Sequence, residues 1–319
     1  MSTRNHLVWS EKYQSDLSVL GSEVAFALDR GKRVLEELKT EFSITPAFRR
    51  PRAVSMKRLQ LVHSGAYLRS LKGPQAWAKI FGTAPLPESE ETSAKLANLL
   101  KEVRIKSGGT LLAARLALKH GLAANLGGGY HHAYADHGDG FCLLNDIAVA
   151  VRTLQDEKLV KKVLIVDLDF HQGNGTSHIF HRDEDVYTLD LHTKEGWPFQ
   201  KERSTHDVPI ARFDGPLYLE KLQAALDKAL KKFKPELVIM VQGADAYEHG
   251  MLTRGEGFSL PLATMKARDE LVIDTFASGN IPLALVFAGG YGGKAWEAHY
   301  QGVRHLLLRA GLLTHRTDN

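Results

Sequence analysis

From residue 100 onward, the chain alternates short apolar runs with longer segments of helical spacing. The runs are rich in Val, Ile and Leu, and their length is typical of buried strands. We expect strands at Val163–Leu168, Val186–Leu191, Leu237–Val241 and Leu283–Ala288. Helical periodicity marks Leu111–Ala117, Ile147–Gln155, Leu217–Lys232 and Lys266–Phe276. Strands that are apolar at nearly every position predict an α/β fold, with a parallel sheet covered by helices on both faces.

The first third of the chain is predicted to be helix-rich and is interrupted by two irregular stretches. One is basic, between Arg49 and Arg58, and the other, Thr83–Thr92, is rich in Pro, Ser and Glu. Such compositions are typical of solvated surface loops. Neither stretch has the character of a linker, so we expect a single domain over residues 1–319.

Composition narrows the class of protein. The chain is 44% hydrophobic and 24% charged, as globular proteins are. Its net charge of 41 − 37 = +4 is too small for a dedicated nucleic-acid binder, so we expect no direct contact with nucleic acid. No apolar run approaches the roughly 18 residues of a membrane span. Residues 1–10 lack the apolar core of a secretion signal, which predicts a cytoplasmic location. The single cysteine, Cys142, excludes a disulfide framework and a multi-thiolate zinc site.

Polar side chains follow two of the predicted strands. Asp167, Asp169 and His171 end one strand at alternate positions, so their side chains point the same way if the chain is extended. Asp245 follows the apolar run Leu237–Val241, in the sequence Gly-Ala-Asp. Ligand sites of parallel sheets lie beyond the carboxyl ends of the strands. Two carboxylates and an imidazole suit a catalytic zinc ion with one open position, although iron and manganese remain possible. The competing interpretation is that Asp167 and Asp169 only cap the next helix.

Two further segments carry polar groups that suit acid–base chemistry. His131 and His132 follow three glycines, and adjacent side chains in extended backbone diverge, so an acid–base role fits them better than shared metal binding. Asp167 and Asn174 are candidates to orient the two rings. Tyr291 stands between glycine pairs after the last strand and can donate to a developing oxyanion. The residues Gly290-x-Gly292-x-x-Ala295 also fit the pattern of a dinucleotide-binding loop. We reject this interpretation, because the roughly 25 residues that follow leave no room for the βαβ unit that the pattern requires.

Five ordered motifs resemble the histone deacetylase-like family of zinc-dependent lysine deacylases. They are Gly128-Gly-Tyr-His-His132, Gly140-Phe-Cys142, Asp167-Leu-Asp-Phe-His-Gln-Gly-Asn-Gly175, Gly243-Ala-Asp245 and Gly289-Gly-Tyr291. The resemblance spans roughly residues 60–295 and is nearest to the class IV branch. It implies an arginase/deacetylase-type fold with a central eight-stranded parallel sheet. It also implies zinc bound by Asp169, His171 and Asp245, a His131–His132 acid–base pair, and a carbonyl-polarising Tyr291.

The same resemblance implies further sites. A substrate tunnel is expected at Gly140, Phe141, Trp197 and Leu252, and a potassium ion at Asp167, Asp169, His171, Asp190 and Leu191. Asp190 stands where relatives often have serine, and Asn174 where many have aspartate. The segment after Asp245 lacks the aspartate and proline common in relatives, which leaves the rim of the tunnel undefined.

We therefore expect a zinc-dependent amidohydrolase that removes acetyl or longer acyl groups from lysine side chains of proteins or peptides. An acetylpolyamine amidohydrolase-like enzyme shares every catalytic residue and is the main alternative. Arginase-like chemistry and a catalytically inactive binding module fit the His-His and Gly-Gly-Tyr elements less well. The sequence leaves open the acyl length, the native substrate and the oligomeric state.

Overall fold

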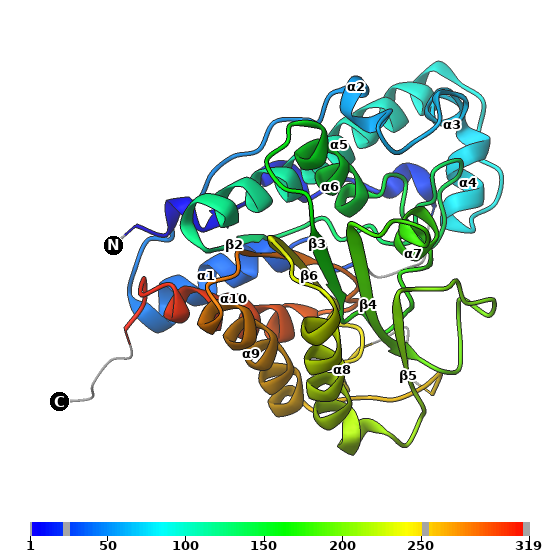
Figure 1. Cartoon of the computed structure of the whole chain (residues 1–319). Helices are drawn as coiled ribbons and strands as arrows, with labels where there is room; N and C mark the ends of the chain where they lie inside the picture. The colour runs from blue at the N-terminus through cyan, green and yellow to red at the C-terminus, as the bar shows by residue number, and fades with distance from the viewer. Residues whose placement is uncertain (1, 22–25, 251–254, 315–319) are drawn as a thin grey trace.

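The computed structural model describes residues 2–21, 26–250 and 255–314. Its centre is a parallel sheet with strand order β1-β2-β7-β6-β3-β4-β5 (Figure 1). Every neighbouring pair in this sheet is parallel. The strands are β1 (Leu7–Val8), β2 (Leu122–Asn125), β3 (Val163–Asp167), β4 (Val186–Thr193), β5 (His206–Ile210), β6 (Leu237–Gln242) and β7 (Leu283–Phe287).

Helices cover both faces of the sheet (Figure 1). Alternate residues of each strand face opposite sides. Accordingly, Leu164 and Val166 of β3 belong to a core shared with α1, α8, α9 and α10, whereas Val163 and Ile165 pack with α5 and α6. The α-helices are α1 (Arg30–Phe42), α2 (Met56–Leu59), α3 (Gly65–Ser70), α4 (Pro74–Phe81), α5 (Glu90–His120), α6 (Asp146–Asp156), α7 (Asn174–Phe180), α8 (Tyr218–Lys232), α9 (Leu262–Ser278) and α10 (Ala295–Arg309). Short 3₁₀ turns are η1 (Thr3–Asn5), η2 (Glu11–Tyr13), η3 (Ser18–Leu20) and η4 (Gly215–Leu217).

The predicted α/β class is confirmed, and all four predicted strands are present with ends shifted by at most two residues. The expected count of eight strands is wrong for the described residues, which form seven. The segment that comes nearest to an eighth strand lies beside β1, where Arg49 N donates to Leu7 O at 2.8 Å and Trp9 N donates to Arg49 O at 3.1 Å. Prolines at 46 and 51 flank this contact and have no N–H to donate, so it remains a single bridge.

A third cluster joins α2, α3 and α4 to α5 and to the loop before α6. His63 is buried in this region and is bonded to backbone through both ring nitrogens. Its Nδ1 donates to Tyr134 O at 3.0 Å, and its Nε2 accepts from Asn145 N at 3.0 Å. Burial lowers the pKa of His63 to about 4, so the ring is neutral. Among the described residues, no helix combines the length and the apolar character that a membrane crossing requires.

Candidate active site

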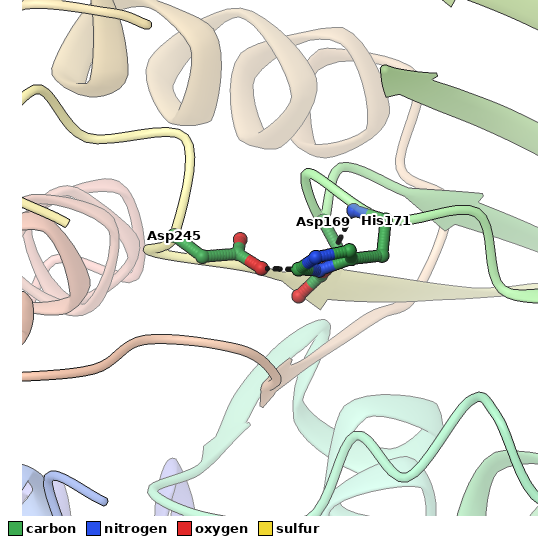
Figure 2. A group of neighbouring side chains, drawn as sticks. All are labelled: Asp169, His171 and Asp245. Atoms are coloured by element: carbon green, nitrogen blue, oxygen red, sulfur yellow. Dashed lines mark hydrogen bonds and ion pairs between the residues drawn. The ribbon is translucent and has the colours of Figure 1, made fainter. Parts of the chain in front are cut away.

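Three potential metal ligands meet beyond the carboxyl ends of β3 and β6. Asp169 and His171 follow β3, Asp245 follows β6, and the two strands are direct neighbours in the sheet. One ligand atom from each residue lies within 4.8 Å of the others, and all three side chains are buried or nearly so. His171 Nδ1 lies 2.9 Å from Asp245 Oδ2 and 3.4 Å from Asp169 Oδ1. Figure 2 shows Asp245 facing the His171 ring, with Asp169 on the side of His171. Such a group of nitrogen and oxygen donors can hold a zinc ion.

Backbone amides hold the two carboxylates in place. Gly289 N donates to Asp169 Oδ2 at 2.7 Å, and Phe170 N donates to Asp245 Oδ1 at 3.0 Å. A Cβ at Gly289 would come within 2.5 Å of Asp245 Oδ2 and 2.6 Å of Asp169 Oδ2. The glycine therefore lets the β7 loop lie against both carboxylates at once.

Arg268 of α9 joins the two loops that carry Asp169 and Asp245, and it belongs to no motif that was recognisable in the sequence. Its fully buried side chain donates from Nη1 to the carbonyls of Leu168 and Gly243, each at 3.0 Å. The guanidinium also pairs with Asp269, with Nη2 at 2.8 Å from Oδ1. Since Leu168 directly precedes Asp169 and Gly243 lies two residues before Asp245, Arg268 fixes the spacing of the ligand loops.

The two adjacent histidines lie beside these ligands, with ring centroids 3.9 Å apart. His131 Nδ1 donates to Asp167 Oδ2 at 2.8 Å, and His132 Nδ1 donates to Asn174 Oδ1 at 2.8 Å. The structure thus brings together both predicted ring partners and both rings. With Nδ1 engaged, each ring is left with Nε2 for chemistry, and His131 Nε2 lies 3.7 Å from Asp169 Oδ1.

The environments of the two rings separate their protonation states. Burial, with positive charge on His131 and His171, lowers the pKa of His132 well below its usual value. Burial also acts to lower the pKa of His131, but the charges of Asp167 and Asp169 prevail and raise it to about 10. A pair of titratable groups with pKa values pushed apart is typical of acid–base sites. Here the shifts keep His132 neutral and His131 charged at neutral pH.

The loop that carries the histidines is fixed by Asp146, the first residue of α6. Its carboxylate accepts from Gly129 N at 3.0 Å and from Tyr130 N at 2.7 Å, and it also accepts from the Thr110 hydroxyl. This buried carboxylate lies outside the five motifs, so nothing in the sequence marked Asp146 as part of the site. It sets the position at which the chain enters His131.

Tyr291 lies across the site from the histidines, in the loop after β7. Its backbone forms an antiparallel bridge with Phe26, and its ring centroid lies 6.0 Å from that of Phe26 and 6.4 Å from that of Phe141. Burial and the charges of Asp245 and Asp169 raise the pKa of Tyr291 well above its usual value. The hydroxyl therefore remains a donor over the working pH range of proteins. Phe26 carried no recognisable signal in the sequence.

Two of the predicted tunnel residues, Gly140 and Trp197, lie next to His132. Gly140 has φ +50°, and a Cβ there would come within 2.5 Å of Trp197 Cη2 and 2.6 Å of His132 Cδ2. The ring centroid of Trp197 lies 4.5 Å from that of His132. Phe141 also has a positive φ of 66° and stands edge-on to Phe26, with centroids 5.2 Å apart. The fourth predicted tunnel residue, Leu252, lies outside the described residues.

The residues predicted to hold potassium lie behind the His131 ring. Asp167 and Asp190 are direct partners in the β3–β4 register, so two buried carboxylates stand side by side. Asp190 Oδ2 accepts from Gly173 N at 2.9 Å and Oδ1 from His192 Nδ1 at 2.7 Å. Leu191 is the next residue of β4 and is fully buried.

A cavity of about 120 Å³ opens among these groups and extends past them into the protein. His131, His132, Asp169 and Tyr291 line one part of it. The cavity therefore provides space for a substrate beside the histidine pair, Asp169, His171 and Tyr291. Asp245, Asp167, Asn174 and Trp197 do not line it.

The Histone deacetylase domain family model matches residues 25–306 of this chain. Histone deacetylase 2 of Arabidopsis thaliana is 33% identical over 326 residues, which cover 98% of this chain and 81% of that protein. An uncharacterized protein of Picosynechococcus sp. is 37% identical over 255 residues, 78% of this chain and 79% of its own. The acetoin utilization protein AcuC of Bacillus subtilis is 32% identical over 224 residues, 64% of this chain and 56% of its own.

Among solved structures, the crystal structure of the HDA15 HD domain has the same fold. Its TM-score is 0.75 at 22% identity, over 95% of this chain and 90% of that one. The family match extends over most of the chain, and the match to the plant deacetylase covers nearly all of it. The chain therefore belongs to the histone deacetylase family and is a deacetylase-type hydrolase.

Proposed function

We propose that the protein is a zinc-dependent deacylase that acts on acylated lysine side chains of proteins or peptides. The observation that carries this proposal is the joint placement of two groups. Asp169, His171 and Asp245 offer three ligand atoms within 4.8 Å of one another, and the His131–His132 pair stands directly beside them.

The donor set fits zinc on chemical grounds. Three carboxylates, including Asp167, and one imidazole are buried together at the end of β3, and such charge is costly to bury without a cation. One nitrogen and two oxygen ligands leave a fourth position free in tetrahedral geometry. A zinc ion bound there would act as a Lewis acid on the amide carbonyl and on the attacking water.

The residues of the chain supply the remaining chemistry. His132, which is neutral, accepts a proton from the attacking water at Nε2 and delivers it to the leaving amine. Asn174 keeps the Nδ1 proton of this ring in place. His131, held in its charged form by Asp167, adds positive potential. Tyr291 donates its hydroxyl proton to the carbonyl oxygen as negative charge develops there.

The walls beside His132 suit the methylene stem of a lysine. Trp197 presents its ring next to His132, and Phe141 lines the same cavity as His132. Gly140 adds no side chain where His132 and Trp197 come close. We assign substrate contact to these three residues. The class IV assignment is also part of the proposal, and it rests on His171-Gln-Gly-Asn-Gly175.

We further assign a potassium ion to the Asp167–Asp190 pair, with the backbone oxygens of His171 and Leu191 as additional ligands. Two adjacent buried carboxylates favour a cation of this kind, because the two hydrogen bonds that each accepts from described residues leave lone pairs for an ion.

The test uses metal-reconstituted protein and acetyl-lysine peptides, with acetylpolyamines and a chelator-treated sample in parallel. Tyr291→Phe is expected to retain stoichiometric zinc and to lose about 10²- to 10³-fold in kcat, as expected for loss of one oxyanion donor. Asp245→Asn is expected to lose zinc itself. Full activity of Tyr291→Phe on every amide, or stoichiometric zinc in Asp245→Asn, would refute the corresponding role. Cleavage of acetylpolyamines alone would favour the small-substrate alternative.

A further inference from the structure

The cavity beside the catalytic residues has a second, positively charged end. Beyond His131 and His132, its lining continues over Leu126 and the glycines at 127–129 to Arg30 and Lys106. The catalytic end and the cationic end belong to one continuous space. A substrate whose amide lies at the catalytic end can therefore extend its acyl chain towards the cationic end.

Lys106 is a buried cation whose ammonium group forms no ion pair with any residue that the structure describes. Lys106 lies on α5, and only 7% of its surface is exposed. Its Nζ donates a hydrogen bond to Ser15 Oγ at 2.9 Å. Glu102, one turn earlier, has the strongest favourable charge effect on Lys106, but its buried Oε2 makes no hydrogen bond. Buried lysines are rare unless they are paired.

Burial lowers the pKa of Lys106 to about 8. An anion placed next to the ammonium group would offset this loss of solvation and hold the lysine in its charged form. The side chain therefore has an unused capacity for charge-assisted hydrogen bonds.

Arg30 supplies a second cation at this end. Its Nη1 donates to Ala288 O and lies 3.1 Å from His299 Nε2. Among the described residues, its Nε and Nη2 make no hydrogen bond, and no carboxylate pairs with it. The two cations stand on a wall that also contains Tyr13, Tyr130, Leu126 and the glycines at 127–129. Two cations on such a wall suit one anion that enters from the catalytic end.

Building on the proposed function, we propose that Lys106 and Arg30 form a carboxylate-binding subsite for the far end of the acyl group. The substrates that fit best are lysines whose acyl group ends in a carboxylate, such as succinyl-lysine or glutaryl-lysine. With the amide carbonyl at the zinc ligands, the acyl chain points into the cavity and its terminal carboxylate meets the two cations.

The reaction remains a simple hydrolysis. Water adds to the acyl carbon, the C–N bond breaks, the acyl group leaves as a dicarboxylate, and the lysine amine takes up a proton. No oxidant, reductant or further co-reactant is needed.

The first experiment compares peptides that differ only in the end of the acyl chain. Succinyl-lysine is matched with 4-methylpentanoyl-lysine, in which an isopropyl group replaces the carboxylate, and malonyl, glutaryl and acetyl peptides complete the set. We expect kcat/KM for the best carboxylated chain to exceed that of its uncharged match by about tenfold or more, the effect of one charge-assisted hydrogen bond. If every uncharged chain is preferred, the subsite is overturned while the proposed function stands.

The second experiment assigns the preference to Lys106. Lys106→Gln and Lys106→Met remove the charge and are expected to lower the succinyl to 4-methylpentanoyl ratio of kcat/KM by about tenfold. Lys101→Gln removes an exposed lysine of the same helix and should leave the ratio unchanged. An equal ratio in wild type and both Lys106 variants overturns the assignment.

A binding measurement decides the case without turnover and independently of variant folding. Calorimetry on zinc-loaded wild-type protein compares succinate with 4-methylpentanoate, which share one carboxylate for the catalytic end. Tighter binding of succinate by about tenfold supports the subsite even if no peptide is cleaved, in which case only the proposed function fails. Equal binding of the two acids, or acetate binding that depends on Lys106 without any succinate preference, overturns the proposal.

Discussion

Replacing Arg268 by methionine tests how the ligand loops are held. The change keeps an unbranched side chain of similar length but leaves Asp269 buried with only the Gln242 amide as a donor. Breaking a buried ion pair by removing one partner costs about 3 to 5 kcal/mol. For a chain of 319 residues, about 4 kcal/mol corresponds to a fall in Tm of roughly 6 °C.

The same substitution frees the carbonyls of Leu168 and Gly243, which precede the proposed zinc ligands Asp169 and Asp245. Loss of an outer partner of this kind lowers metal affinity by about 10- to 100-fold. The double variant Arg268→Met/Asp269→Leu separates the two effects. It removes both charges and should regain most of the stability, whereas the zinc affinity should stay low.

Denaturant unfolding and chelator competition for zinc are the two assays. Arg309→Met is the control, because Arg309 pairs with Asp274 at the surface with both side chains about half exposed, and should cost less than about 1 kcal/mol. If Arg268→Met is no less stable than this control, the Arg268–Asp269 ion pair makes no net contribution to the free energy of unfolding. If Arg268→Met binds zinc as tightly as the wild type, the positioning role is wrong.

Two further predictions concern the site wall and the pH dependence of stability. Gly140→Ala would place a Cβ within 2.5 Å of Trp197 Cη2 at φ +50°, so kcat/KM should fall by about 10- to 100-fold with the fold intact. The control is Gly293→Ala, whose Cβ would meet nothing within 4 Å and which should not change kcat/KM. Equal activity of the two variants would contradict the close approach at Gly140. His63 has a folded pKa of about 4 against 6.5 for the free side chain, so the unfolded chain binds more protons between these values and stability falls as pH drops through this window. From pH 7 to pH 5 the loss should be about 2 kcal/mol in urea unfolding and should shrink in His63→Gln, and equal slopes for both proteins would refute the assignment.

The sequence predicted the central strands well because their burial on both faces makes them continuously apolar. The same signal fails for β1, which has two residues, and for β5, which contains Pro209 and is only partly buried. It also understates α5, where the glycine pair after Ser107 resembles a break. In the structure, Gly108 and Gly109 stay helical and allow close contact with Arg52 and Tyr13, respectively.

The sequence could predict that the three candidate metal ligands lie together, because parallel strands bring their carboxyl ends to one edge of the sheet. The supporting groups were not identifiable, because they come from helices far away in sequence and belong to no motif. Arg268 sits in a run of charged residues that is typical of a solvated helix face, yet it is fully buried. Arg30 and Lys106 meet only through the packing of α1 and α5 around the cavity.

The neighbouring position of β3 and β6 has a consequence for folding. His171 and Asp245 are separated by 74 positions in the chain, and β4, β5 and α8 lie in that interval. The three side chains cannot come together until this segment has folded and β6 has paired with β3. Pairing between strands so far apart in the sequence is slow. With zinc at this triad, as proposed above, zinc uptake during refolding reports when the centre of the sheet closes, and zinc release during unfolding reports when it opens.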